Sequence, residues 1–115
     1  MNVVVLRGTL SRQPEERSLP SGDRLVGFEV TVPALDGGRS ESVPVVWHDP
    51  PAEALALAKG DEVAVLGRVR RRFFRAGGST QSRTEVVAER VVPADNQRRV
   101  STLFRSAGRQ LAPSG

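Results

Sequence analysis

Residues 67–75 read Gly-Arg-Val-Arg-Arg-Arg-Phe-Phe-Arg and continue a valine-rich run that starts near residue 62. In an extended strand the side chains alternate between two faces, so Arg68, Arg70, Arg72 and Phe74 share one face. Side chains on one face of a β-strand repeat about every 7 Å, close to the spacing of phosphates along an extended single strand of nucleic acid. The stretch therefore predicts a long strand whose second half is a basic arm. A solvated hairpin arm without a ligand is the alternative, because charge runs usually face water.

The composition bounds the class of protein. The chain has 115 residues, the size of one domain with one modest core. Its net charge is +4, and Lys59 is the one lysine among 17 basic residues. Arginine binds phosphate through a planar fork and stacks on bases, so this balance suits nucleic acid or another polyanion.

Other classes are excluded or disfavoured. The chain has no cysteine, which excludes disulfides and the usual zinc sites. No apolar run approaches the roughly 20 residues that cross a bilayer, and the first residues lack the pattern of a signal peptide. We expect a cytoplasmic protein without a membrane partner.

The chain in order predicts an all-β fold. Strands are expected over residues 3–10, 25–34, 41–47, 62–74 and 81–92, with residues 11–22 as a polar turn. A short helix is expected from Asp49 as its cap to Gly60 as a left-handed stop, with Lys59 in its last turn. Three strands, a helix and two strands is the order of a five-stranded OB-fold barrel with its helix between strands three and four.

The C-terminal residues form a separate segment in this prediction. We place the barrel domain at residues 1–93 and a basic amphipathic tail at residues 94–115. Apolar residues recur in the tail at helical spacing, with arginines between them: Val100, Leu103, Phe104, Ala107 and Leu111. Docking on the barrel through this stripe is favoured over a free nucleic-acid arm, and a role in assembly stays open.

The sequence holds no constellation for catalysis. His48 is the one histidine, next to Asp49 at a strand end, which is more often a loop residue than a general base. Adjacent carboxylates such as Glu15 and Glu16 point to opposite faces of an extended chain. We expect no enzyme activity, no cofactor and no metal site.

The residues that suit nucleic-acid binding are more numerous. Phe28 shares its parity with valines and is expected in the core, so Trp47, Phe73 and Phe74 are the candidate stacking platforms. With few platforms, electrostatics should dominate binding and affinity should fall steeply with salt. The predicted binding residues are Arg7, Arg24, Arg39, Trp47, Arg68, Arg70, Arg72, Phe74, Arg75 and Arg83.

The chain resembles the bacterial single-stranded DNA-binding protein family over about residues 1–93. The similar segments are residues 2–10, the loop containing Pro14-Glu15 and Leu19-Pro20-Ser21-Gly22, residues 28–32, residues 59–70 and residues 84–89. The resemblance implies a barrel that binds single-stranded DNA in replication, repair and recombination and that usually assembles as a homotetramer. It also implies that Phe74 is a stacking aromatic, that Trp47 lies near another, and that Arg7, Arg70 and Arg72 are basic contact positions.

The chain also departs from the family pattern. Polar residues around Glu41 and Ser42 stand where the family has a tryptophan, and a loop aromatic is missing from residues 35–40. The family's acidic, Phe-ended tip does not follow, so recruitment of repair enzymes through such a tip is not expected. We therefore predict sequence-nonspecific single-stranded DNA binding by a diverged paralogue, as a homo-oligomer in which a tetramer is favoured over a dimer. The alternative is a non-catalytic assembly module or primosomal-type partner with weak DNA binding.

Overall fold

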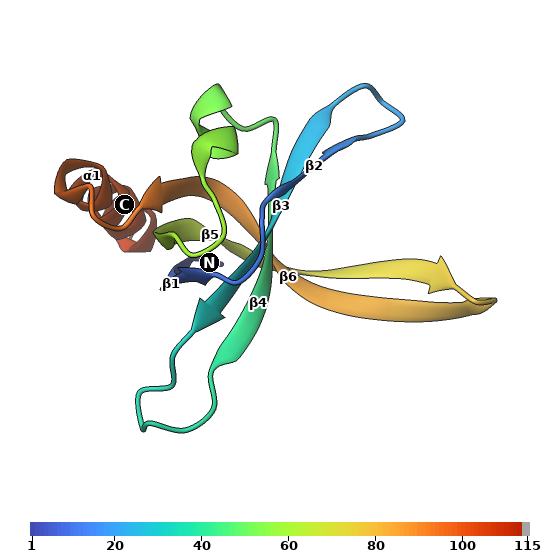
Figure 1. Cartoon of the computed structure of the whole chain (residues 1–115), viewed down its shortest axis with the longest axis horizontal. Helices are drawn as coiled ribbons and strands as arrows, with labels where there is room; N and C mark the ends of the chain where they lie inside the picture. Colours follow the sequence, from blue (N-terminus) through green and yellow to red (C-terminus); the bar gives the residue numbers. More distant parts are fainter. Residues whose placement is uncertain (114–115) are drawn as a thin grey trace.

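The structure is a computed structural model and describes residues 1–113. Residues 1–113 form six strands, a short 3-10 helix and one α-helix (Figure 1). The strands are β1 (Val4–Leu10), β2 (Glu15–Ser18), β3 (Arg24–Val32), β4 (Glu41–His48), β5 (Glu62–Ala76) and β6 (Ser79–Pro93). The 3-10 helix η1 spans Ala52–Ala56 and the helix α1 spans Gln97–Leu111.

Five of the strands close a ring. The sheet order is β1-β5-β6-β4-β3-β2, and β1 also pairs with β3 through Thr9–Thr31 and Leu10–Val30. The strand β2 pairs with β3 alone and extends the sheet beside the ring. The five strands that the sequence predicted are confirmed, and ring closure leaves few free backbone edges.

Two glycines allow the strands to approach each other where the ring bends. A Cβ atom on Gly8 would lie 2.4 Å from the carbonyl oxygen of Thr31, and one on Gly67 would lie 2.3 Å from that of Val87. At Gly67 the β5–β6 register also shifts, since Leu66 pairs with Arg90 and Gly67 pairs with Ala88. Such a bulge bends a sheet. Beyond it, β5 and β6 leave the ring as a long two-stranded arm (Figure 1).

The core has two parts, one inside the ring and one beneath α1. Inward-facing residues of all five ring strands fill the first part, among them Phe28, as predicted, and Val65. The second part lies on the outer side of β5 and β6, where Ala64 and Leu66 pack against Leu103 of α1. Asn96 caps this helix, because its Oδ1 accepts a hydrogen bond from the Arg99 backbone nitrogen at 3.1 Å.

The predicted helix of the tail is present and is docked on the barrel, as expected. Its buried face consists of Leu103, Ser106 and Ala107, whereas Phe104 and Leu111 of the predicted stripe remain exposed. Ser114 and Gly115, the end of the predicted tail, lie outside the described residues. Among residues 1–113, no helix is long and apolar enough to span a membrane.

The predicted helix after β4 is wrong in length, type and cap. The chain forms only the five-residue 3-10 helix η1, and it lacks a side-chain cap. Asp49 has a φ of 47° and its backbone nitrogen donates to the Arg24 carbonyl oxygen at 2.7 Å, so it ends the β3–β4 pairing. Gly60 does adopt the predicted left-handed conformation, with φ of 94°, but in a turn after Lys59 that is no longer helical.

Candidate nucleic-acid interface

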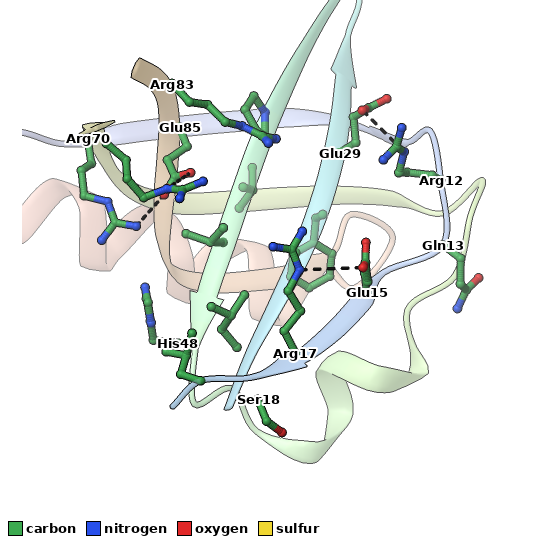
Figure 2. A pocket seen from close by; sticks show the side chains of 18 residues that line it. Arg12, Gln13, Glu15, Arg17, Ser18, Glu29, His48, Arg70, Arg83 and Glu85 are labelled. Atoms are coloured by element: carbon green, nitrogen blue, oxygen red, sulfur yellow. Dashed lines mark hydrogen bonds and ion pairs between the residues drawn. The ribbon is translucent and has the colours of Figure 1, made fainter. Parts of the chain in front are cut away.

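A groove of about 420 Å³ lies on the outer face of the β2–β3–β4 sheet, beside the base of the arm (Figure 2). Strand register explains which residues meet there. Arg17 pairs with Leu25 and Leu25 with His48, and Gly27 in turn pairs with Val46. Side chains in such rows point to the same side of a sheet. The sequence thus places one row of side chains from three strands along the groove.

The floor of the groove is largely apolar. Leu25, Pro44 and Val46 line it, together with Gly27. A Cβ atom on Gly27 would meet only the Glu15 carbonyl oxygen, at 3.9 Å, so the space above this glycine is open. An apolar and open floor can contact the face of a base by dispersion and burial.

The rim of the groove is basic. Five arginines and three glutamates line it, which is a formal excess of two positive charges. The basic residues are Arg12, Arg17, Arg70, Arg72 and Arg83. Arg12 lies 3.6 Å from Glu29, and Arg17 lies 3.7 Å from Glu15 (Figure 2). Exposed pairs of this kind contribute about 0–1 kcal/mol, so a phosphate can compete for both arginines.

Glu85 differs from the other two carboxylates because it is buried, with 2% of its surface exposed. The Nη2 atom of Arg70 donates to Glu85 Oε2 at 2.5 Å, and the Nε atom of Arg72 donates to Oε1 at 3.4 Å. Burial alone would raise the pKa of Glu85. The hydrogen bond from Arg70 and the positive charges of Arg72 and Arg70 outweigh it, so the pKa lies below its usual value. Glu85 is therefore ionised at neutral pH and offsets part of the arginine charge.

The aromatic rings of the arm carry arginines on one face. The Cζ atom of Arg72 lies 5.1 Å from the centre of the Phe74 ring, and that of Arg71 lies 5.9 Å from the Phe73 ring. These distances fit cation–π contacts. Phe74 is half-buried and Phe73 is exposed. Each ring thus has one side already occupied in the free protein.

Comparison with known proteins identifies the family of this chain. Residues 1–94 match the Single-strand binding protein family. This chain belongs to that family. The resemblance of residues 1–93 noted from the sequence is thereby confirmed.

Individual relatives agree with the assignment. A single-stranded DNA-binding protein of Deinococcus radiodurans is 32% identical over 100 residues, covering 79% of this chain and 33% of the relative. One of Oceanobacillus iheyensis is 38% identical over 100 residues, covering 79% and 62%. Single-stranded DNA-binding protein 3 of Listeria innocua gives the same identity and coverage. The chain thus spans between 33% and 62% of the length of these relatives.

Within this member of the single-strand binding family, the structure gathers only some of the predicted site residues. Arg70, Arg72 and Arg83 line the groove. Arg68 lines a neighbouring hollow, which shares His48 with the groove. Phe74 and Arg75 lie further out along the arm, where Arg75 donates to the Gly78 carbonyl oxygen at 3.3 Å.

The other predicted residues lie elsewhere. Arg7 is on β1 and pairs with Glu62 at 2.7 Å. Arg24, at the start of β3, donates to the Pro50 carbonyl oxygen at 2.8 Å. Arg39 is in the exposed loop between β3 and β4. Trp47 is 9% exposed and belongs to the core inside the ring. Its side chain belongs to the same core cluster as Val45, and its stacking role stays a prediction.

Sequence reasoning missed Arg12, Arg17 and His48 as groove residues. Arg12 and Arg17 belong to the segment that was expected to be a polar turn, but this segment includes the strand β2. An edge strand that is exposed on both faces has no apolar alternation to reveal it. His48 was expected at a strand end, just past the predicted strand 41–47, and it is the last residue of β4, two positions from Val46. Period-two counting from Val46 along β4 would have found it.

Proposed function

We propose that this protein binds single-stranded DNA without sequence preference, in the groove between β2–β3–β4 and the arm. The observation that carries the proposal is an open apolar floor inside a rim of five arginines. Bases of a single strand can lie on such a floor while their phosphates reach the guanidinium groups. Paired bases in a duplex are stacked inside the helix and cannot use the floor. Membership in the single-strand binding protein family supports the proposal.

We further propose that the ring is an OB-fold barrel, with residues 1–93 as its binding domain and residues 94–115 as an attached tail. OB-folds bind ligands on the face of their second and third strands, between the loop after the first strand and the loop after the fourth. In this ring the second and third strands are β3 and β4, and the fourth-strand loop is the tip of the arm. The groove lies on that face.

The cellular setting is part of the same proposal. DNA binding of this kind serves replication, repair or recombination in the cytoplasm, and the protein acts without catalysis or a cofactor. A homo-oligomer, with a tetramer favoured over a dimer, fits the exposed apolar residues Phe104 and Leu111 on α1. The same exposed residues favour the second candidate function, a non-catalytic assembly module with weak DNA binding.

Fluorescence anisotropy of labelled oligo-dT tests the proposal. We expect tight binding at low salt and a slope of log K against log salt of about −3, from roughly four phosphate contacts. Affinity should then fall roughly 50-fold between 50 and 200 mM salt. A duplex of the same length is the control and should bind much more weakly. Equal affinity for both, or no binding to oligo-dT, would contradict the proposal. Sedimentation mass with and without oligo-dT distinguishes the proposed function from the assembly module. An assembly module should form oligomers whose mass does not change when oligo-dT is added.

A further inference from the structure

We infer that Glu85 is a positioning residue: it holds Arg70 away from DNA and presents Arg72 to a phosphate. The inference rests on the proposed function. It assigns different roles to Arg70 and Arg72, which the sequence alone presents as equivalent. Three observations support it: the burial of Glu85, the buried Nε atom of Arg70 beside its short bond to Glu85, and the two terminal nitrogens of Arg72, which face no partner in the described part of the chain.

Arg70 is held by a contact within the protein. It lies directly opposite Glu85 in the β5–β6 register, and its Nη2 atom donates to the buried carboxylate at 2.5 Å. Its Nε atom is buried and is the one such side-chain atom among residues 1–113 without a hydrogen-bond partner. A phosphate cannot reach a buried Nε atom, so the side of the guanidinium group that includes it is closed to a bidentate contact.

Arg72 is differently placed. Only its Nε atom faces Glu85, at 3.4 Å, and its guanidinium group lies over the Phe74 ring. Neither of its terminal nitrogens has a hydrogen-bond partner within the described part of the chain. The bond from Nε to Glu85 and the contact with the Phe74 ring fix the plane of the Arg72 guanidinium group. The edge formed by its two terminal nitrogens stays free. A guanidinium held in this way presents two parallel N–H groups, the geometry that binds a phosphate.

The cross-strand neighbours explain why a buried carboxylate is needed here. Arg72 pairs directly with Arg83, and like charges in opposite positions destabilise a sheet. Glu85 lies two residues from Arg83 on the same face of β6 and contacts both Arg70 and Arg72. Its negative charge lets three arginines share this small area. Without it, repulsion would drive Arg72 away from its fixed orientation.

A charge-neutral double variant tests the inference. Arg70→Gln/Glu85→Gln removes one positive and one negative charge, so the net charge of the groove is unchanged. We expect its salt slope for oligo-dT to fall by about 0.7, the value of one phosphate contact, just as in Arg72→Gln. Adding Arg72→Gln to the double variant should cause little further loss, because Arg72 is then no longer positioned. If Arg70 and Arg72 each bound a phosphate independently, the triple variant would lose about 1.4 in slope.

The pair Arg99→Gln/Glu53→Gln is the matched control, since it removes an ion pair between α1 and η1 outside the groove. When Arg72→Gln is added to this control variant, the salt slope for oligo-dT should still fall by about 0.7. Wild-type binding by the Arg70→Gln/Glu85→Gln variant would overturn the inference while leaving the proposed function intact. If the wild-type protein fails to bind oligo-dT, the proposed function fails and the inference with it.

Arginine side-chain NMR of the wild-type protein gives a second test that needs no substitution. The Nε–H signal of Arg70 should exchange slowly with water and keep its position when oligo-dT is added. The Nε–H signal of Arg72 should shift. A shift of the Arg70 signal as large as that of Arg72, or no shift of either signal in a complex that has formed, would overturn the inference.

Discussion

The side chain of Asn2 pairs with the backbone of Val69 as a strand residue would. Its Nδ2 atom donates to the Val69 carbonyl oxygen at 2.7 Å, and its Oδ1 atom accepts from the Val69 nitrogen at 2.9 Å. These two bonds extend the β1–β5 ladder past Val4, which pairs with Gly67. They also brace β5 at the point where it leaves the ring and becomes the arm.

Asn2→Ala should therefore lower the free energy of unfolding by about 1–2 kcal/mol, since two hydrogen bonds at an exposed position are lost. Urea unfolding followed by circular dichroism measures this. Asn2→Asp is the informative companion, because a carboxylate can accept from Val69 but cannot donate to it. It should also be destabilising, and stability equal to wild type in both variants would show that the pair is not a brace.

Gly67→Ala should be strongly destabilising, by about 3 kcal/mol or more, because its Cβ would collide with a backbone oxygen that cannot move aside. Gly108→Ala is the matched control. A Cβ on Gly108 meets nothing within 4 Å, and alanine favours a helix interior over glycine by about 1 kcal/mol. The two glycine-to-alanine changes should thus shift the melting temperature in opposite directions. A shift in the same direction would contradict the close approach at the bulge.

The stability of the protein should depend on pH through Glu85. Its pKa in the folded state lies below the usual value, so its contribution is complete above about pH 4.3 and is lost as the pH falls from there through the folded pKa. At neutral pH, Glu85→Gln should cost about 2 kcal/mol, less than a fully buried pair because both arginines reach solvent. Urea unfolding between pH 7 and about pH 2.5 checks the sign. The stability gap between the two proteins should narrow in acid, and a constant gap would show that the charge of Glu85 is irrelevant.

Gly27→Leu should separate DNA binding from stability. The space above Gly27 is open, and a larger side chain suits a strand better than glycine does, so stability should be unchanged or slightly higher. The new side chain would occupy the groove floor and should weaken oligo-dT binding about tenfold, by analogy with losing one base contact. Unaltered affinity in a folded variant would mean that bases do not use this floor.

The strands of the ring were predictable because each carries apolar residues at a period of two, as Val26, Phe28 and Val30 do on β3. The same rule, applied to Val45, would also have placed Trp47 inside the ring. The helix α1 was predictable from its apolar stripe, although only the residues nearest the barrel are buried. In these elements the spacing of apolar residues within the segment itself predicts which face is buried.

Other features depend on contacts that no local pattern reveals. The strand β2 forms by backbone pairing with β3 and buries none of its own residues. Asp49 adopts a left-handed conformation and bonds back to Arg24, which ends β4, and the η1 segment that follows has no side-chain cap. Glu85 follows a run of polar residues, and its burial arises only when Arg70 and Arg72 lie across from it. The division of roles among the arginines was therefore outside the reach of sequence reasoning.

Amide chemical-shift mapping of the full chain with oligo-dT tests the location of the binding site most directly. The account predicts that the largest shifts fall on the groove, at Leu25, Gly27, Val46, His48 and Arg83, and that Arg7 on β1 and Phe104 on α1 change little. Shifts concentrated around Arg7 or Phe104, with the groove residues unchanged, would contradict it.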